Sequence, residues 1–256
     1  MKDLEIVFKG KKTHLKIGGE GETILILHGW QSSSENWKKV IEILEKKLRV
    51  ICPDLPGFGK SFSLEKKWKI KDYVEWLEDF VDYFNLNDFY LFGHSFGGKL
   101  AIKFSFENQK RIKCLLLCSP SVIRPKLGIN QKFIVFLAKF GNFLFPKKFF
   151  GNLREFLTNV FCFLFLRNSD YCKAKGVIRE TFKEIIKEDV FSQISNFNLK
   201  TVIFWGKNDK ITPVEHAFLL KQKIKNSKLE ILEGLGHSPH LEDPERFCRI
   251  LVENLE

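Results

Sequence analysis

Short apolar runs alternate along the chain with longer segments whose apolar positions recur at helical spacing. The first of these runs, residues 23–27, is continuously apolar, which is typical of a parallel strand that is covered on both faces. The runs span residues 23–27, 49–52, 89–92, 114–118, 201–205 and 229–232. A small hairpin, made by residues 6–8 and 13–17, is expected before the first of them. Strands that alternate with helices predict an α/β fold with a mostly parallel central sheet and helices on both faces.

The segments between these runs predict the helices. Apolar residues recur every three or four positions in residues 34–48 and 70–84, and a further helix is expected after residue 95, to about residue 108. Two later helices are marked by their first residues. Thr212, Pro213 and Glu215 form a capping-box arrangement with Pro in the first turn. Asp243 is expected to cap the last helix, which is predicted to run to Leu255.

The alternation stops after residue 120 and resumes near residue 198. Between these points the chain shows only helix-like, Phe-rich and basic segments. We therefore expect an α/β core made of residues 1–120 and 198–256, with residues 121–197 inserted as a helical cap. No internal repeat or low-complexity linker divides the chain further.

The charge of the chain is concentrated in the same insertion. The whole chain carries a formal net charge of +11, and residues 121–190 contribute +7, from 13 Lys or Arg and 6 Asp or Glu. A basic balance can indicate nucleic acid, an anionic membrane or an acidic substrate. Because no RNA- or DNA-binding motif accompanies the charge, we favour a Lys-rich solvated surface and expect no nucleic-acid partner.

Cysteine usage and hydropathy indicate the cellular compartment of the protein. The six cysteines include no C-x-x-C pair and no histidine at metal-ligand spacing, which predicts buried free thiols in a reducing environment. The first residues have no apolar stretch of signal-peptide length. The longest uncharged stretch of the Phe-rich insertion, residues 156–166, is shorter than the roughly 20 residues of a membrane-spanning helix. The expected location is the cytoplasm.

The most informative motif is Gly93-His94-Ser95-Phe96-Gly97, which follows an apolar run and precedes a helix-like stretch. A serine between two glycines at a strand-to-helix junction is typical of a nucleophile elbow. The turn is so sharp that its flanks have no room for side chains, a need that glycine meets. The elbow would expose the Ser95 hydroxyl at the N-terminus of a helix, where backbone N–H groups stabilise negative charge.

A serine nucleophile needs a base and an acid that orients the base. Asp209 follows the run at 201–205, and His237 follows the run at 229–232. The order Ser, Asp, His along the chain is the order expected of an α/β hydrolase. Each of the three residues follows the carboxyl end of a predicted parallel strand, where such sheets place their ligand sites.

Together these features resemble the α/β-hydrolase fold superfamily, in its lidded, esterase-like serine-hydrolase branch. The resemblance covers the whole predicted core. The residues that carry it are His28-Gly29-Trp30, the stretch at 54–61, the stretch at 93–98, Asp209, and Gly236-His237. Relatives that are haloalkane dehalogenases or epoxide hydrolases carry Asp at the elbow, so Ser95 separates this chain from them.

The resemblance implies a role for each residue. Ser95 would be the nucleophile, His237 the general base and then the general acid, and Asp209 the group that orients the imidazole. The backbone N–H groups of Trp30 and Phe96 would form the oxyanion hole. Neither a metal nor an organic cofactor is implied.

Other residues are candidates for the same catalytic roles. His240 is the only serious alternative to His237 as the base. Asn208 lies beside Asp209, but a neutral amide cannot stabilise an imidazolium as a carboxylate does. Ser119 follows the run at 114–118 and is interpreted as structural.

The hypothesis that follows is a carboxylesterase-type serine hydrolase that cleaves a small, mostly apolar carboxylic ester through an acyl-serine intermediate. Two alternatives stay open: a C–C bond hydrolase or thioesterase with the same triad, and a slow-hydrolysing ligand receptor. The expected partner is a small-molecule ester, and the expected assembly is a monomer or a weak homo-oligomer.

The insertion bears on the substrate. Residues 133–165 include 11 Phe, most of which we expect in the core of the cap, with some lining an apolar acyl pocket. Basic residues lie among the rings, so peripheral membrane contact is left open as a further interpretation. It would predict liposome binding that weakens with salt.

Overall fold

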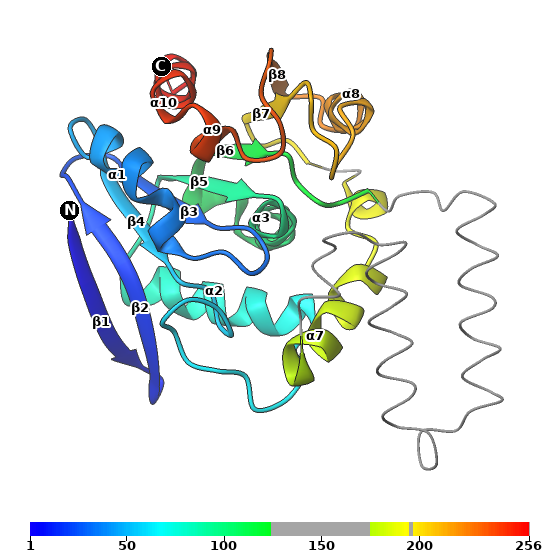
Figure 1. Cartoon of the computed structure of the whole chain (residues 1–256). Helices are drawn as coiled ribbons and strands as arrows, with labels where there is room; N and C mark the ends of the chain where they lie inside the picture. The colour runs from blue at the N-terminus through cyan, green and yellow to red at the C-terminus, as the bar shows by residue number, and fades with distance from the viewer. Residues whose placement is uncertain (124–174, 195–196, 256) are drawn as a thin grey trace, which may run out of the picture.

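One eight-stranded sheet organises the part of the chain that the computed structural model describes, residues 1–123, 175–194 and 197–255 (Figure 1). The strands are β1 (Lys2–Phe8), β2 (Lys11–Gly18), β3 (Thr23–Leu27), β4 (Arg49–Pro53), β5 (Phe89–His94), β6 (Ile112–Cys118), β7 (Thr201–Gly206) and β8 (Ser227–Leu232). Their order is β1-β2-β4-β3-β5-β6-β7-β8. The hairpin β1–β2 and the pair β2–β4 are antiparallel, and all later pairs are parallel. The predicted mostly parallel sheet is confirmed.

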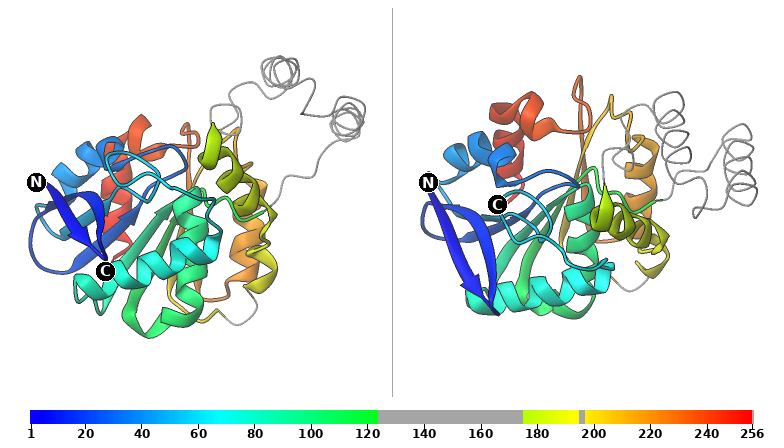
Figure 2. Two further views of the ribbon diagram at one scale, coloured as in Figure 1. Left: turned by 90° about the horizontal axis from the view of Figure 1, so that it is seen from below. Right: turned by 60° about the horizontal axis from the view of Figure 1, so that its bottom comes forward.

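Helices cover both faces of this sheet, as predicted. They are α1 (Lys38–Leu44), α2 (Ile70–Tyr83), α3 (Phe96–Asn108), α7 (Gly176–Lys187), α8 (Glu215–Lys223), α9 (Pro239–Glu242) and α10 (Pro244–Glu253), with short 3-10 turns at Ser34–Trp37, Gln109–Arg111 and Phe191–Gln193. Figure 1 shows α1, α9 and α10 on one face and α2 and α3 on the other. Figure 2 shows the same layers from two further sides.

The central strands are mostly apolar because they face two cores. In β3, Leu25 and Leu27 belong to the core under α2 and α3, whereas Ile24 and Ile26 belong to the core under α1 and α10. All four side chains are fully buried. Successive side chains of a strand point to opposite faces, so a strand between two helical layers needs apolar residues at every position.

The strand order creates one switch point. The chain passes from β3 through α1 to β4 on one side of β3, and then through α2 to β5 on the other side. The segments that follow β3 and β5 therefore leave the sheet side by side, with Leu27 paired to Gly93 at their ends. Open α/β sheets bind ligands in the crevice at such a point.

Of two predicted N-terminal helix caps, one is confirmed and the other is wrong. Asp243 caps α10 as predicted, with its carboxylate accepting from the backbone N–H of Arg246 at 3.1 Å. The expected capping box at Thr212 is wrong: α8 begins at Glu215, and no side chain caps it. The Thr212 hydroxyl instead lies 2.7 Å from Asp209, so a tertiary contact has replaced a local one.

Part of the sequence interpretation falls outside the described residues. Of the expected cap at 121–197, the structure describes α7 and the turn at Phe191–Gln193, both helical. Most of the predicted Phe-rich lining lies in residues 124–174. Four of the six cysteines are described, and all four are free and buried, namely Cys52, Cys114, Cys118 and Cys248. Among the helices of the described residues, none has the length and apolar character needed to cross a bilayer.

Candidate active site

Ser95 stands at the junction of β5 and α3 in a strained conformation. Its backbone has φ 52° and ψ −111°, outside the regions that a residue with a Cβ ordinarily adopts. Three hydrogen bonds hold this geometry: the Ser95 N–H donates to the Cys118 carbonyl at 3.0 Å, and the Ser95 carbonyl accepts from the N–H groups of Lys99 and Ser121, both at 3.1 Å. Strain that persists in this way is characteristic of functional sites. The predicted elbow is therefore present as backbone geometry.

The flanking glycines are required by close backbone contacts. A Cβ on Gly93 would lie 2.5 Å from the carbonyl oxygen of Gly97, and a Cβ on Gly97 would lie 2.1 Å from the carbonyl oxygen of Leu27. Gly98 is equally confined, since its Cβ would lie 2.7 Å from Pro120. Because these neighbours are backbone or ring atoms, they cannot move aside as a flexible side chain would. Glycine is the residue that lets α3 start directly against β3 and β5.

Asp209 and His237 form a direct pair behind this turn. The Nδ1 atom of His237 lies 2.8 Å from Oδ2 of Asp209. The other carboxylate oxygen, Oδ1, accepts from the backbone N–H groups of Ile211 at 2.8 Å and Thr212 at 2.9 Å. The Thr212 hydroxyl also donates to Oδ2 at 2.7 Å. Every lone pair of the carboxylate that faces the protein has a partner, so its orientation toward the imidazole is fixed.

The same contacts keep Asp209 ionised. Burial raises the pKa of this carboxyl, but the hydrogen bond and charge of His237 and the bonds from Thr212 outweigh burial and lower the pKa to about 2. An ionised carboxylate accepts the Nδ1 proton of the imidazole. The arrangement therefore favours the tautomer of His237 whose Nε2 lone pair is free to accept a proton.

The backbone of His237 is tied to the elbow through His94. The Nε2 atom of His94 lies 2.8 Å from the backbone carbonyl oxygen of His237, and the two ring centres are 5.0 Å apart. No hydrogen bond joins Ser95 Oγ to His237 within the described residues. Catalytic hydrogen bonds of unliganded enzymes are often long and tighten when substrate binds. The structure thus brings the three predicted residues to one end of the sheet, with the hydroxyl and imidazole not yet bonded.

Ser95 opens onto an apolar cavity of about 500 Å³. Its described lining combines Trp30 and Phe96 from the core, Val122 and Ile123 after β6, Phe182, Ile185 and Ile186 from α7, and Ile211 and His216 near α8. The aromatic rings pack on one another: Trp30 lies 5.3 Å from Phe96 and 5.1 Å from Phe182, centre to centre. A concave, mostly apolar space with a few polar groups at one end is the usual form of a small-molecule site.

Comparisons with known proteins agree with this geometry. A family model described as the alpha/beta hydrolase fold matches residues 22–144. Solved structures superpose on nearly the whole chain, including an esterase from Exiguobacterium antarcticum (21% identical, TM-score 0.74, 97% of each chain). A meta-cleavage product hydrolase from Pseudomonas fluorescens is 22% identical, with a TM-score of 0.72 over 98% of this chain and 96% of the other. This chain has the α/β-hydrolase fold.

Among curated relatives of this hydrolase is the monoacylglycerol lipase ABHD6 of Rattus norvegicus. It is 26% identical over 263 residues, which cover 93% of this chain and 76% of the relative. The structural matches below 25% identity establish the fold alone.

The loop after β3 of the hydrolase has a defined backbone orientation. His28 accepts from the Leu55 N–H at Nε2 (2.9 Å), so its Nδ1 carries the proton and donates to the Gly29 carbonyl at 2.7 Å. The Ser32 N–H donates to the same carbonyl at 3.2 Å. Because the two groups of a trans peptide point in opposite directions, the Trp30 N–H is turned away from both donors. The sequence had indicated this N–H as half of an oxyanion hole.

Phe96 supplies the second N–H of that predicted hole. It is the first residue of α3, where backbone N–H groups have no partner within the helix. Among the described residues neither the Trp30 nor the Phe96 N–H donates to any group. Two such donors next to a partly exposed serine would suit a developing negative charge.

His240, the alternative base, lies elsewhere. Its ring stacks on Trp37 with centres 4.0 Å apart and meets His94 edge-on at 4.6 Å. It is 2% exposed, and burial lowers its pKa well below the ordinary value. Among the described residues its Nδ1 atom has no hydrogen-bond partner, and Asp209 pairs with His237 instead. His240 is thus a neutral ring in the packing behind the site.

His94 is expected to make stability depend on pH. Burial, and then the charge of His237, lower its pKa from 6.5 to about 3. Near pH 6.5 the unfolded chain therefore takes up a proton at this histidine that the folded chain does not bind. The contribution of neutral His94 to the free energy of unfolding is complete above pH 6.5 and is lost as the pH falls from there toward 3. His94→Gln keeps a donor for the His237 carbonyl but does not titrate.

Between pH 6.5 and 5 we expect the free energy of unfolding to fall by about 1.5 kcal/mol more in the wild type than in His94→Gln. Urea titrations followed by tryptophan fluorescence at these two pH values measure the difference. Equal losses in both proteins would mean that His94 takes up its proton in the folded state.

Two residues of the site were missed or misread in the sequence. Thr212, interpreted as a helix cap, bonds Asp209 with both its hydroxyl and its N–H; its spacing of three residues from an Asp was the available signal. Lys99 lines the cavity although it is 4% exposed. Nothing local to Lys99 marks it, because its partners are far along the chain.

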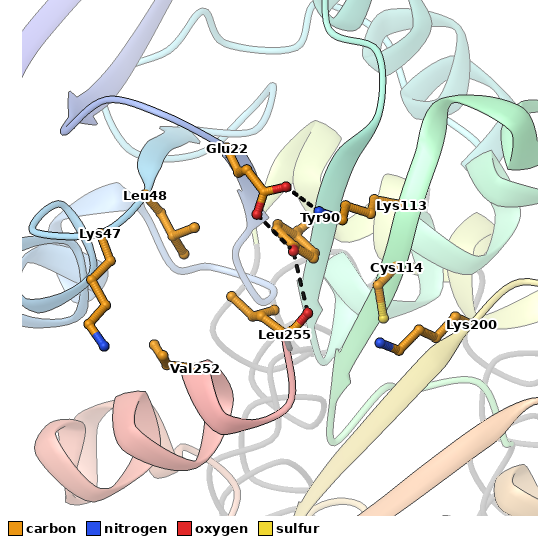
Figure 3. A pocket seen from close by; sticks show the side chains of 9 residues that line it. All are labelled: Glu22, Lys47, Leu48, Tyr90, Lys113, Cys114, Lys200, Val252 and Leu255. Carbon is orange, nitrogen blue, oxygen red and sulfur yellow. Dashed lines mark hydrogen bonds and ion pairs between the residues drawn. The ribbon is translucent and has the colours of Figure 1, made fainter.

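A second cavity, of about 550 Å³, lies at the opposite end of the sheet (Figure 3). Tyr90 donates to Glu22 at 3.1 Å, Lys113 pairs with the same carboxylate, and Lys47 and Lys200 stand on opposite sides of the space. The lining residues that the structure describes include no Ser, His or Asp. Within the described chain, no three His, Cys, Asp or Glu side chains gather as ligands for a metal ion. The candidate chemistry is therefore at the Ser95 end.

Proposed function

We propose that this hydrolase cleaves carboxylic esters with an apolar acyl group through an acyl-serine intermediate on Ser95. One observation carries the proposal: a serine held at φ 52° opens onto an apolar cavity at the end of the sheet where Asp209 and His237 form a hydrogen-bonded pair. Each part alone occurs in proteins without catalysis. Their combination provides a nucleophile, a base with an orienting carboxylate, and a binding space.

The proposed reaction has two halves. His237 Nε2 takes the Ser95 proton as Oγ attacks the ester carbonyl, and the Trp30 and Phe96 N–H groups stabilise the oxyanion. Collapse of this intermediate breaks the C–O bond, and the imidazolium returns the proton to the leaving alcohol. Water then attacks the acyl-serine with His237 again as base, which releases the carboxylic acid and restores Ser95. Asp209 stabilises the imidazolium in both halves.

The substrate class follows from the cavity. Its described walls are mostly apolar, so burial of an acyl chain is favourable at roughly 25 cal/mol per Å² of apolar surface. The relation to a monoacylglycerol lipase supports an acyl ester, since that protein's name specifies a glycerol ester of a fatty acid. We propose that the substrate is a small, mostly apolar ester and that residues 121–197 form a cap that covers the pocket. The helix α7, which lies within that range, forms one wall of the pocket.

A panel of p-nitrophenyl esters from acetate to palmitate tests this function. We expect turnover of short and medium esters with saturable kinetics, and stoichiometric labelling by a fluorophosphonate. Matched thioesters and a vinylogous diketone, assayed in parallel, decide between ester, thioester and C–C chemistry by their relative kcat/KM. A stoichiometric burst without further turnover would indicate a slow-hydrolysing receptor. No labelling and no hydrolysis of any substrate would overturn the proposal.

A further inference from the structure

Lys99 is a buried cation one turn beyond the nucleophile. It lies in the first turn of α3, its backbone N–H donates to the Ser95 carbonyl, and its side chain lines the Ser95 cavity. A positive charge near a helix N-terminus is opposed by the helix dipole, and a buried charge is costly unless it is hydrogen-bonded. Its position therefore requires compensating contacts.

Those contacts are carbonyl oxygens at the end of α7. The Lys99 ammonium donates to the carbonyl of Ile185 at 2.7 Å and to the carbonyl of Glu188 at 2.8 Å. The last four carbonyls of a helix have no partner within it, and this end carries the negative pole of the dipole. The residue after α7, Glu188, is extended at φ −76° and ψ 124° rather than left-handed, so no glycine-type cap closes this helix. Lys99 caps α7 from a neighbouring element.

The helix α7 forms a wall of the cavity. Phe182, Ile185 and Ile186 line the space, and Phe182 packs against Trp30 of the loop after β3. At its middle, α7 is attached through Thr181, whose hydroxyl accepts from the Trp68 N–H at 3.1 Å beside the start of α2 (Figures 1 and 2). At its end, the attachment is Lys99, which belongs to the same helix as the elbow.

We propose that Lys99 is a positioning residue that holds the end of α7 at a fixed distance from Ser95 and thereby sets which acyl lengths the pocket accepts. The inference rests on the proposed esterase function. The acyl chain contacts Ile185 and its neighbours, and Lys99 acts on substrate through them. Loss of the ammonium frees the C-terminal turn of α7, so the wall moves and the selection of chain length weakens.

The main variant is Lys99→Met, which keeps the unbranched side chain up to the position of Cε and removes the ammonium group. The control is Lys103→Met, one turn further along α3, whose ammonium reaches Gln193 at 2.6 Å and the Glu188 carboxylate at 3.3 Å from a half-exposed position. We measure kcat and KM for p-nitrophenyl esters from acetate to dodecanoate in the full-length proteins. Hydrogen exchange of peptides that cover α7 is followed by mass spectrometry, with α2 as internal reference.

For Lys99→Met we expect kcat/KM on the preferred ester longer than acetate to fall at least tenfold more than kcat/KM on acetate, mainly through KM. Amides at the end of α7 should exchange at least tenfold faster, with α2 unchanged. Lys103→Met should match the wild type in both assays, and Lys99→Arg should restore much of the chain-length profile. A uniform fall for every ester with normal exchange in α7, or no change in either assay, would overturn the proposal.

Two further outcomes are separable. If the wild type hydrolyses no ester and takes no fluorophosphonate label, the proposed function has failed, yet exchange in α7 still tests the docking role of Lys99. If Lys99→Met does not fold, Lys99→Gln keeps one donor without the charge and is assayed in its place. A normal chain-length profile in folded Lys99→Gln together with unprotected α7 amides would contradict the link between wall and selectivity.

Discussion

Ser95→Ala is expected to abolish covalent labelling by a fluorophosphonate and to lower kcat on the best ester by a factor of roughly 10⁴ or more. The substitution removes Oγ, the proposed attacking atom, and leaves the backbone contacts of the elbow intact. Because alanine retains the Cβ of serine, the strained conformation at φ 52° costs no more than before. The thermal midpoint should therefore stay within a few degrees of the wild type, measured by circular dichroism.

Ser119→Ala is the matched control for that experiment. Ser119 also follows a parallel strand and also has a positive φ, of 45°, but its hydroxyl is buried without a partner and is not in the cavity lining. We expect full labelling and near-normal turnover. If Ser95→Ala still labels, the nucleophile is another residue; if Ser119→Ala loses labelling while folded, the two serines have been assigned wrongly.

Asp209→Asn is expected to lower kcat by a factor of about 10⁴, as tautomer loss does in such triads. The contacts of the carboxylate explain why. Oδ1 accepts from the N–H groups of Ile211 and Thr212, so the amide oxygen of an asparagine must occupy that position. The amide nitrogen then takes the place of Oδ2 and donates to Nδ1 of His237. The imidazole is forced to carry its proton on Nε2, where it cannot accept one from Ser95.

The measurement is kcat and kcat/KM on the preferred p-nitrophenyl ester across pH 6 to 9. Asp79→Asn serves as the control, since Asp79 makes an exposed ion pair with Lys9 that contributes little to stability. A loss below tenfold in Asp209→Asn would show that another acid orients the base. Labelling of Ser95 should slow in proportion to kcat.

The accuracy of the sequence interpretation varied with the range of the interactions involved. The elbow at Ser95 and the cap at Asp243 were predicted because each depends on neighbours within a few residues. The positions of Asp209 and His237 were predicted by a resemblance, and the strand ends that carry them lie in adjacent strands of the sheet. Thr212 was misread because its local pattern also suits a helix cap, and the carboxylate of Asp209 competes for the same hydroxyl. The Phe-rich stretch at 133–165 lies outside the described residues, so its predicted role is untested.

The sequence by itself determined the alternation of strands and helices, the glycines of the elbow and the chain order of the candidate triad, because local sterics and the periodicity of apolar residues depend on near neighbours. Tertiary structure alone decided that His240 stacks on Trp37, that the Trp30 N–H is left unpaired, and that Lys99 caps a helix 86 to 89 residues away. Such contacts arise when distant segments close on one another. Their partners are chosen by packing and by the need to satisfy buried polar groups, which no local pattern of residues encodes.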